Sequence, residues 1–508
     1  MRPGLGIAVA AIVAVATVAA YAPAWRGAFV CDDIAEIAEN PAIRSLWPPW
    51  VPMFEGTPMP HRPLPYYTFA VNYAAHGLDP RGYHAVNLAI HLANGWLLWW
   101  VVREIVGRLG SGAQQAAVIA AAAATLWLVH PLGTQAVAYV YQRIESLAAL
   151  AMLATLACFL RAITAPNPES WLVASVAASS LGMLCKEHVA AAPIAVLLVD
   201  WLAVRWRPDA PWRSLTDAIR GRPWYYTALF ATPLIAVSLV IVQRDRYTDF
   251  EQTLAGPLLY AANQPLVIGS YLARSIWPAP LCLDWYRLPI KDPAVLAPGL
   301  ASMVAAVGLA IWGVGVRPGV ALAILLFLAL LAPTSSVLPV NDLMVEHRMY
   351  LPLAVVAVGV AALGNGLIGR HVARPWRPWV GTTIVTVVSL GLAVATWSRC
   401  HAYQSRLVMW ADVVTKAPGN PRGWQTLALE LWQAGATERA LEAVDRSLAI
   451  VPQAPMSQMT RAGILLDLGR AAEAVEAADR AIALDPRVGD AHRVREAAIE
   501  ARRQADGK

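Results

Sequence analysis

Residues 296–316 read LAPGLASMVAAVGLAIWGVGV, an apolar run that contains no charged side chain. A run of this length is long enough to cross the hydrocarbon core of a bilayer as one α-helix. The rest of the chain has a similar character, because 57% of its 508 residues are hydrophobic and only 15% are charged. The sequence therefore predicts an all-α, polytopic membrane protein.

Further apolar runs near spanning length bring the predicted transmembrane helices to about eleven. They lie at residues 5–22, 84–102, 115–131, 145–163, 170–185, 188–204, 225–243, 296–316, 319–338, 351–369 and 380–398. The first run could instead be a cleaved signal peptide, but the many spans after it favour an uncleaved helix. If the N-terminus is cytoplasmic, arginines gather in the inward-facing loops, in agreement with the positive-inside rule.

One further run, PLLYAANQPLVIGSYLARSIW at 257–277, is apolar but includes Asn263, Gln264, Pro265 and Arg274. An arginine near the middle of the membrane costs about 2.5–3.5 kcal/mol on insertion scales. If this run crossed the membrane, every later loop would change sides and an arginine-rich loop would face outward. We interpret it as a re-entrant or interfacial helix in a long outer loop.

The composition excludes several other classes of protein. The net charge of +6 comes with arginines in short loops, and no basic stripe with interleaved aromatics indicates nucleic-acid binding. The five cysteines are scattered and show no CxxC spacing, which argues against a disulfide framework and a zinc site. We expect no metal or other cofactor.

After residue 398 the composition changes and the sequence repeats with a period of 34 residues. Pro418, Pro452 and Pro486 are each 34 residues apart, and the same shift superimposes Gly435 on Gly469. This is the period of tetratricopeptide (TPR) repeats, which are pairs of antiparallel helices. We predict a membrane domain at 1–398 and a TPR domain at 399–508, which would bind a peptide or protein, or act as a strut.

The loops on the predicted outer side carry many acidic and basic residues. They are Asp32, Asp33, Glu36, His61 and Arg62 in the first loop; His130, Arg143 and Glu145 in the second; Lys186, Glu187 and His188 in the third; and Glu346, His347 and Arg348 in the last. A lone charge at a helix end usually only extends to the membrane interface. Mixed acids and bases in four loops on one side indicate a cleft at the outer membrane surface.

Such a cleft is suited to a lipid-linked sugar donor. The lipid tail would stay in the bilayer while Arg and Lys side chains bind the phosphate. A carboxylate would take the proton from an acceptor hydroxyl. Two neighbouring carboxylates such as Asp32 and Asp33 repel, which raises the pKa of one of them toward a useful range.

Six stretches, in order along the membrane domain, resemble one family. They are FVCDDIAEIAENP at 29–41, HRPLPYYTFAVNYAAHGLDPRGYHAVNLAIHLAN at 61–94, LVHPLGTQAVAYVYQRIESLAAL at 128–150, CKEHVAAAPIAVLLVDWL at 185–202, LCLDWY at 281–286 and LPVNDLMVEHRMYLPL at 338–353. With them the chain resembles bacterial relatives of the TMTC-type, dolichyl-phosphate-mannose:protein O-mannosyltransferases. These are GT-C membrane glycosyltransferases with a C-terminal TPR tail.

The resemblance implies an inverting transfer of a sugar, by default mannose, from a polyprenyl phosphate to a hydroxyl acceptor such as protein Ser or Thr. Asp32 and Asp33 would be the catalytic centre, with Asp32 preferred as the base. The predicted substrate-binding residues are His61, Arg62, Arg143, Lys186, Glu187, Asp284, Glu346, His347 and Arg348. A bacterial chain would use undecaprenyl or a similar carrier. It would lie in the inner membrane, with the site and the TPR domain on the periplasmic side.

Other hypotheses remain open. The predicted TPR tail is short for this family, which a lipid or glycan acceptor would explain. In a hypothesis of another class, the chain is a non-catalytic, membrane-anchored TPR scaffold for periplasmic protein assembly. Individual residues also have structural explanations, since Lys186 and Glu187 would pair at a short turn and Arg348 would anchor a helix at the interface.

Overall fold

The computed structural model describes residues 3–242 and 256–506. Residue 243 of the predicted seventh span, and residues 1, 2, 507 and 508 of the two predicted domains, lie outside the described residues. Within the described ranges every regular element is a helix, which confirms the all-α fold class. The chain forms two compact units: Met1–Leu281 with Leu288–Tyr403, called the membrane unit, and Cys282–Arg287 with Gln404–Lys508, called the C-terminal unit.

Most helices of the membrane unit begin at a proline. Proline is favoured in a first turn because its missing N–H would have no partner there. At the start of α14, for example, Asp292 precedes Pro293 and its side chain accepts a hydrogen bond from the N–H of Ala294. The α-helices are α1 (Pro3–Tyr21), α2 (Trp50–Phe54), α3 (Pro63–His76), α4 (Pro80–Arg108), α5 (Ala113–Leu128), α6 (Thr134–Ala138), α7 (Arg143–Ala162), α8 (Pro168–Met183), α9 (Ala192–Val199), α10 (Pro211–Gly221), α11 (Pro223–Ala231), α12 (Pro233–Val242), α13 (Pro257–Ile276), α14 (Pro293–Val316), α15 (Pro318–Leu331), α16 (Pro352–His371) and α17 (Arg377–Cys400).

The helices of this unit make the chain a multi-pass membrane protein. Within the described residues, eight segments are long and apolar enough to cross a membrane: Ala8–Arg26, Pro80–Arg108, Val140–Ala162, Glu187–Val204, Pro223–Val242, Pro293–Val316, Pro352–His371 and Arg374–Gln404. The pair α5 and Pro131–Ala138, bent by 56°, would be a ninth span. The other two predicted spans coincide with α8 and α15, which have only 16 and 14 residues.

The polar run at 257–277 forms α13, a continuous helix in spite of Pro265. It is not among the candidate spans found in the described residues, and it packs against α14 and α16. Asn263 exchanges two hydrogen bonds with the backbone of Ile290, at 2.8 and 2.9 Å. These bonds satisfy the side-chain amide of Asn263, one of the polar residues that argued against a membrane span. The structure shows a continuous helix in place of a re-entrant turn, and its placement outside the membrane core stays a prediction.

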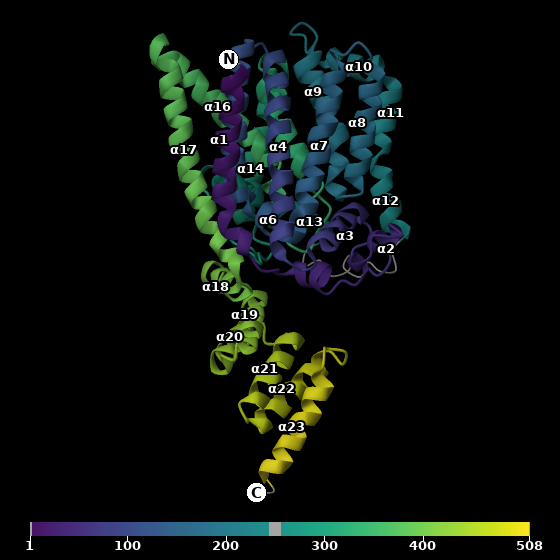
Figure 1. Cartoon of the computed structure of the whole chain (residues 1–508), viewed down its shortest axis with the longest axis vertical. Coiled ribbons are helices and arrows are strands. Elements are labelled where there is room, and N and C mark those ends of the chain that lie inside the picture. The colour runs from purple at the N-terminus through teal and green to yellow at the C-terminus, as the bar shows by residue number, and fades with distance from the viewer. Residues whose placement is uncertain (1–2, 243–255, 507–508) are drawn as a thin grey trace. The chain divides into compact units, whose positions relative to one another are not determined.

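The first loop covers one end of the membrane unit. Helix α1 begins at the opposite end of the bundle, and the segment after it, with α2 and α3, lies across the end that α1 reaches (Figure 1). Residues from four loops meet at this end, and the candidate site is built from them.

The C-terminal unit consists of paired helices and the short segment Cys282–Arg287. Gly435 and Gly469 adopt φ angles of +77° and +73° at the turns inside two of the pairs, a conformation that favours glycine. The repeat of 34 residues thus corresponds to the pairs α19/α20 and α21/α22, and the assignment to TPR repeats stays a prediction. The helices are α18 (Arg406–Lys416), α19 (Pro421–Gln433), α20 (Thr437–Ile450), α21 (Pro455–Asp467), α22 (Ala471–Leu484) and α23 (Ala491–Asp506).

Candidate functional site

The two adjacent aspartates of the first loop lie in different environments. Asp33 is fully buried, and its carboxylate accepts hydrogen bonds from the backbone N–H groups of Val30 at 2.9 Å and Tyr141 at 2.6 Å. Burial raises the pKa of Asp33 well above its usual value, although these bonds oppose the shift. Asp32 is exposed, and its backbone N–H donates to Tyr139 Oη at 2.9 Å. Asp33 therefore joins the loop to the start of α7, whereas a substrate can reach Asp32.

A third carboxyl group, Glu36, lies on the same face as Asp32; the sequence placed it in the predicted cleft but assigned it no catalytic or substrate-binding role. Residues 32–38 form a helical turn, and side chains four positions apart on such a turn are neighbours. Glu36 is 5% exposed and accepts a hydrogen bond from Tyr66 Oη of α3. Burial raises the pKa of Glu36 to about 7, and the charge of Asp32 adds to this shift. The four-residue spacing of Asp32 and Glu36 predicts that they are neighbours only if the loop is known to be helical.

Two ion pairs continue the site beyond Glu36. Arg62 binds Glu187 through two hydrogen bonds, Nε to Oε2 at 3.1 Å and Nη2 to Oε1 at 2.7 Å. Lys186 Nζ lies 2.5 Å from Oε2 of the buried Glu145, whose other oxygen is 3.5 Å from His188 Nε2. Three predicted residues, Arg62, Lys186 and Glu187, are thus brought together. Both cations in this group already have a carboxylate partner.

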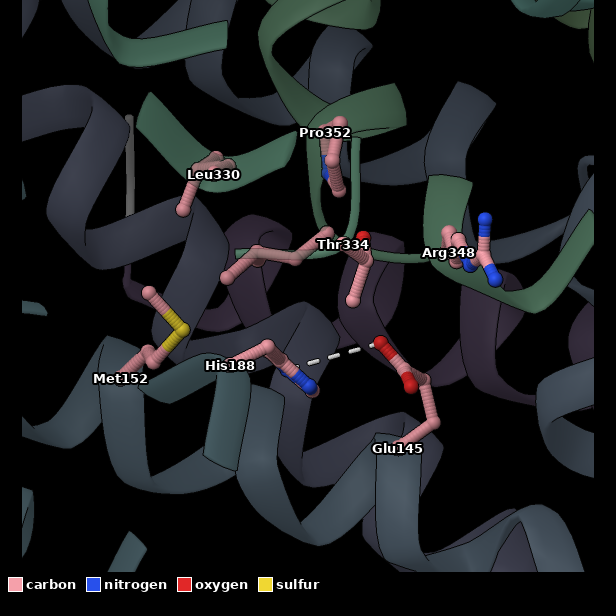
Figure 2. A pocket seen from close by; sticks show the side chains of 8 residues that line it. Glu145, Met152, His188, Leu330, Thr334, Arg348 and Pro352 are labelled. Carbon is pink, nitrogen blue, oxygen red and sulfur yellow. Dashed lines mark ion pairs between the residues drawn. The ribbon is translucent and has the colours of Figure 1, made fainter. Parts of the chain in front are cut away.

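Arg348 lines a cavity next to these pairs. Its guanidinium donates to the backbone oxygens of Asp342 at 2.7 Å and Leu343 at 3.4 Å, and to Tyr260 Oη at 3.4 Å. Within the described ranges, it forms no ion pair with a carboxylate. Figure 2 shows Thr334 opposite His188 and Glu145, with Arg348 to one side. The cavity is small, with a volume of about 10 Å³, and is lined by Glu145, Met152, His188, Leu330, Thr334, Arg348, Leu351 and Pro352.

An apolar groove adjoins this cavity. It has a volume of about 110 Å³ and lies among α4, α7, α15 and α16. Met152, Leu330 and Leu351 line both spaces, so the groove leads into the charged cavity. No lining residue is charged or polar; they are Leu98, Val101, Val102, Ile105, Val106, Leu109, Met152, Leu153, Leu156, Gly319, Leu322, Ala323, Leu326, Leu330, Leu351, Ala354, Val355 and Val358.

Two predicted histidines are held neutral. Burial lowers the pKa of His61 to about 4, and the charge of Arg62 acts in the same direction. Burial also lowers the pKa of His347 well below its usual value, with a further contribution from the charges of Lys186 and Arg348. Neutral imidazoles can exchange hydrogen bonds with a sugar hydroxyl without adding charge.

Arg143 does not reach this group of residues. It is fully buried, and its guanidinium donates to Asn87 Oδ1 at 2.6 Å and to the backbone oxygen of Tyr83 at 3.1 Å, over the ring of Phe69. Its donors thus bind protein groups, and we leave it out of the candidate site. The sequence places Arg143 two residues before Glu145, but the two side chains point to different faces of the first turn of α7.

Glu346 and Asp284 also lie elsewhere. Glu346 is buried, and its charge acts on Tyr271 of α13. Asp284 belongs to the C-terminal unit, where Oδ2 and Oδ1 accept hydrogen bonds from Arg422 Nε and Nη2 at 2.7 and 2.8 Å. This bidentate pair gives Asp284 a structural role in that unit.

Comparison with known proteins identifies relatives that match between about a third and four fifths of the chain. The protein O-mannosyl-transferase TMTC3 of Homo sapiens is 23% identical over 460 residues, which cover 82% of this chain and 48% of the relative. Tmtc3 of Drosophila melanogaster is 32% identical over 209 residues, which cover 35% of this chain and 22% of the relative. The chain resembles the TMTC protein O-mannosyl-transferases. The predicted resemblance is therefore confirmed, and no protein-family model matches.

This TMTC-like chain spans about half the length of human TMTC3 and less of the Drosophila protein. Two structures of an Archaeoglobus fulgidus oligosaccharyltransferase also align with it. One, with a tethered acceptor peptide, is 12% identical, covers 82% of this chain and 57% of its own, and has a TM-score of 0.44. The other, with an inhibitory peptide and dolichol-phosphate, is 13% identical, covers 80% and 57%, and has a TM-score of 0.42.

Proposed function

We propose that the chain is a membrane glycosyltransferase that transfers a sugar from a polyprenyl phosphate to a hydroxyl group, first of all a protein Ser or Thr. The observation that carries the proposal is the junction between the charged cavity and the apolar groove. A lipid-linked phosphate requires both surfaces, because its tail is apolar and its head is an anion. The names of the TMTC relatives support a protein acceptor and make mannose the first sugar to test.

The donor phosphate is assigned to Arg348. Arg62 and Lys186 offset the charges of Glu187 and Glu145, so little of their charge remains for a ligand. Arg348 has no such carboxylate partner among the described residues, and a guanidinium can bind two phosphate oxygens at once. An anion in this cavity would therefore offset a positive charge that no carboxylate of the described residues pairs with.

The acceptor hydroxyl is assigned to Asp32. Charged residues lie between Asp32 and Arg348: Arg62 acts electrostatically on Glu36 and Lys186, and Arg62, Lys186 and Arg348 all act on His347. Asp32 would take the hydroxyl proton while the acceptor oxygen bonds to the anomeric carbon. The bond from that carbon to the phosphate oxygen breaks, and its electron pair stays on the phosphate, beside Arg348. Attack from the face opposite the phosphate inverts the anomeric carbon.

The orientation in the membrane and the role of the C-terminal unit are part of the proposal. We place the site on the periplasmic side of a bacterial inner membrane and assign capture of a protein acceptor to the helix pairs. Cysteine labelling from outside intact cells tests the side. A cysteine at Glu39, an exposed residue of the first loop, should be labelled before the cells are broken.

The transfer itself is tested with purified protein in lipid nanodiscs. Polyprenyl-phosphate mannose is the donor, and periplasmic protein, a Ser/Thr peptide pool and a lipid extract are separate acceptors. Wild type should label the protein or peptide, and Arg348→Gln should raise the KM for the donor by about tenfold or more. Arg370→Gln, which changes an arginine at the end of α16, is the matched control.

Other results would redirect the proposal. Labelling of only the lipid extract would replace the protein acceptor by a lipid or glycan. No transfer with mannose or other sugars on any acceptor would favour the scaffold hypothesis. An unchanged donor KM in Arg348→Gln would remove Arg348 from the phosphate site.

A further inference from the structure

The carboxyl pair that the structure forms is Asp32 with Glu36. Asp32 and Glu36 share one face of the turn at residues 32–38. Asp33, the neighbour in sequence, points away and accepts backbone hydrogen bonds from Val30 and Tyr141. Tyr139 also contacts Asp32, but burial raises the pKa of Tyr139 well above its usual value, so it stays neutral. Glu36 is the neighbour whose charge can change near neutral pH.

Glu36 is enclosed by residues of three segments. Tyr66 of α3 donates a hydrogen bond to its carboxyl group, and Arg62 at the start of α3 lies near enough to lower its pKa. Tyr141, in the second loop, also interacts electrostatically with Glu36, and Asp32 contributes the only negative charge among the causes of the pKa shift of Glu36. Among the described residues, no cation forms an ion pair with Glu36. The protonation of Glu36 is thus controlled by burial, the hydroxyl of Tyr66 and the charges of Asp32 and Arg62.

We propose that Glu36 is a positioning residue that tunes Asp32: ionised Glu36 strengthens Asp32 as the base, and protonated Glu36 weakens it. The physical reason is reciprocity. Two ionised carboxylates on one face of a turn repel each other, so either of them becomes a stronger proton acceptor while the other is charged. The inference rests on the proposed role of Asp32 in the transfer.

The first test is the pH dependence of kcat/KM for transfer. For wild type it should rise through an inflection near pH 7, where Glu36 loses its proton. Glu36→Gln should lack this inflection, match wild type at pH 6 and be about tenfold slower at pH 8. Tyr66→Phe removes a bond that lowers the pKa of Glu36, so its inflection should move to higher pH. The matched control, Glu39→Gln, alters an exposed acid of the same segment and should behave like wild type.

The second test does not depend on activity. Infrared difference spectra of wild type should show a protonated-carboxyl band that disappears with a midpoint near pH 7 and is missing in Glu36→Gln. Asp32→Asn removes the neighbouring charge, so the midpoint should fall.

The two tests separate two kinds of failure. An inflection in Glu36→Gln equal to that of wild type, or the same midpoint in Asp32→Asn and wild type, would overturn the inference. Inactive wild type at every pH would count against the proposed function, and the infrared midpoints would still decide whether Asp32 and Glu36 interact.

Discussion

At the residue scale, the two aspartates of the first loop should respond differently to the same substitution. Asp32→Asn should reduce transfer at least about 100-fold, because the amide cannot accept the proton, and should leave the apparent Tm unchanged. Asp33→Asn places an amide among backbone N–H donors and should cost about 1–3 kcal/mol of stability. Thermal melts and transfer assays on both variants test this. A stable Asp33→Asn with a destabilised Asp32→Asn would reverse the assignment.

The sequence predicted Asp32 and Asp33 as a catalytic pair and preferred Asp32 as the base, but it could not show how their environments differ. The difference depends on which carboxylate accepts the hydrogen bond from the backbone N–H of Tyr141, a contact between residues 108 positions apart. For the same reason the sequence did not separate Arg143, whose partners are buried protein groups, from Arg348, which lines the cavity. Side-chain direction at a loop end is fixed by tertiary contacts and not by local pattern.

His61 provides a stability prediction with a definite sign. Its pKa is about 4 in the folded protein and about 6.5 in an unfolded chain. Between these values the unfolded chain binds a proton that the folded protein does not, so stability is lost as the pH falls from 6.5 to 4. The free energy of unfolding of wild type should therefore fall by up to about 3 kcal/mol relative to that of His61→Gln between pH 6.5 and 4. Melting both proteins at pH 7, 5.5 and 4.5 tests it, and parallel curves would contradict it.

At the element scale, the groove among α4, α7, α15 and α16 should be blocked by a large side chain. Ala323 on α15 lines it, and Ala323→Trp should fill part of the space and raise the KM for the lipid donor about tenfold or more. Ala305→Trp, at an exposed position on the neighbouring α14, is the control and should bind the donor normally. Binding of the free polyprenyl phosphate, measured by the Tm shift it causes, separates lost binding from lost chemistry.

If Ala323→Trp binds the carrier as tightly as Ala305→Trp, the tail lies outside this groove. The comparison also holds if both variants lose some stability, because each is measured against its own Tm without lipid.

Helices were more predictable than sites. All eleven predicted spans coincide with helical segments, because runs of apolar residues report directly on burial in a membrane. The lengths and bends of the helices were less predictable. Helices α8 and α15 have only 16 and 14 residues, and the chain bends by 56° between α5 and Pro131–Ala138. The helical turn at 32–38 was missed because five to seven residues carry too little periodicity to identify a helix.

At the scale of the whole molecule, the boundary between the units is not a single point in the sequence. The C-terminal unit includes Cys282–Arg287, from the loop between α13 and α14. Asn420 and Arg422 hold this segment, with Asn420 Nδ2 donating to the backbone oxygen of Asp284 at 3.1 Å. A change in composition near residue 398 could indicate a second domain, but it could not reveal a segment contributed from more than 100 residues earlier.

The segment from the loop should therefore contribute to the stability of the C-terminal unit. Asp284→Asn and Arg422→Gln should each destabilise α19, and the double variant should be little worse than either, with a coupling of about 1 kcal/mol or less because Arg422 is half exposed. Hydrogen exchange of the α19 amides measures this as up to about a fivefold increase in rate. The pair Arg495 and Asp479, which lies within α22 and α23, is the matched control for a loss of charge. If Asp284→Asn raises the exchange rate of the α19 amides no more than Asp479→Asn does, the loop segment does not stabilise the C-terminal unit. That unit then begins at Gln404.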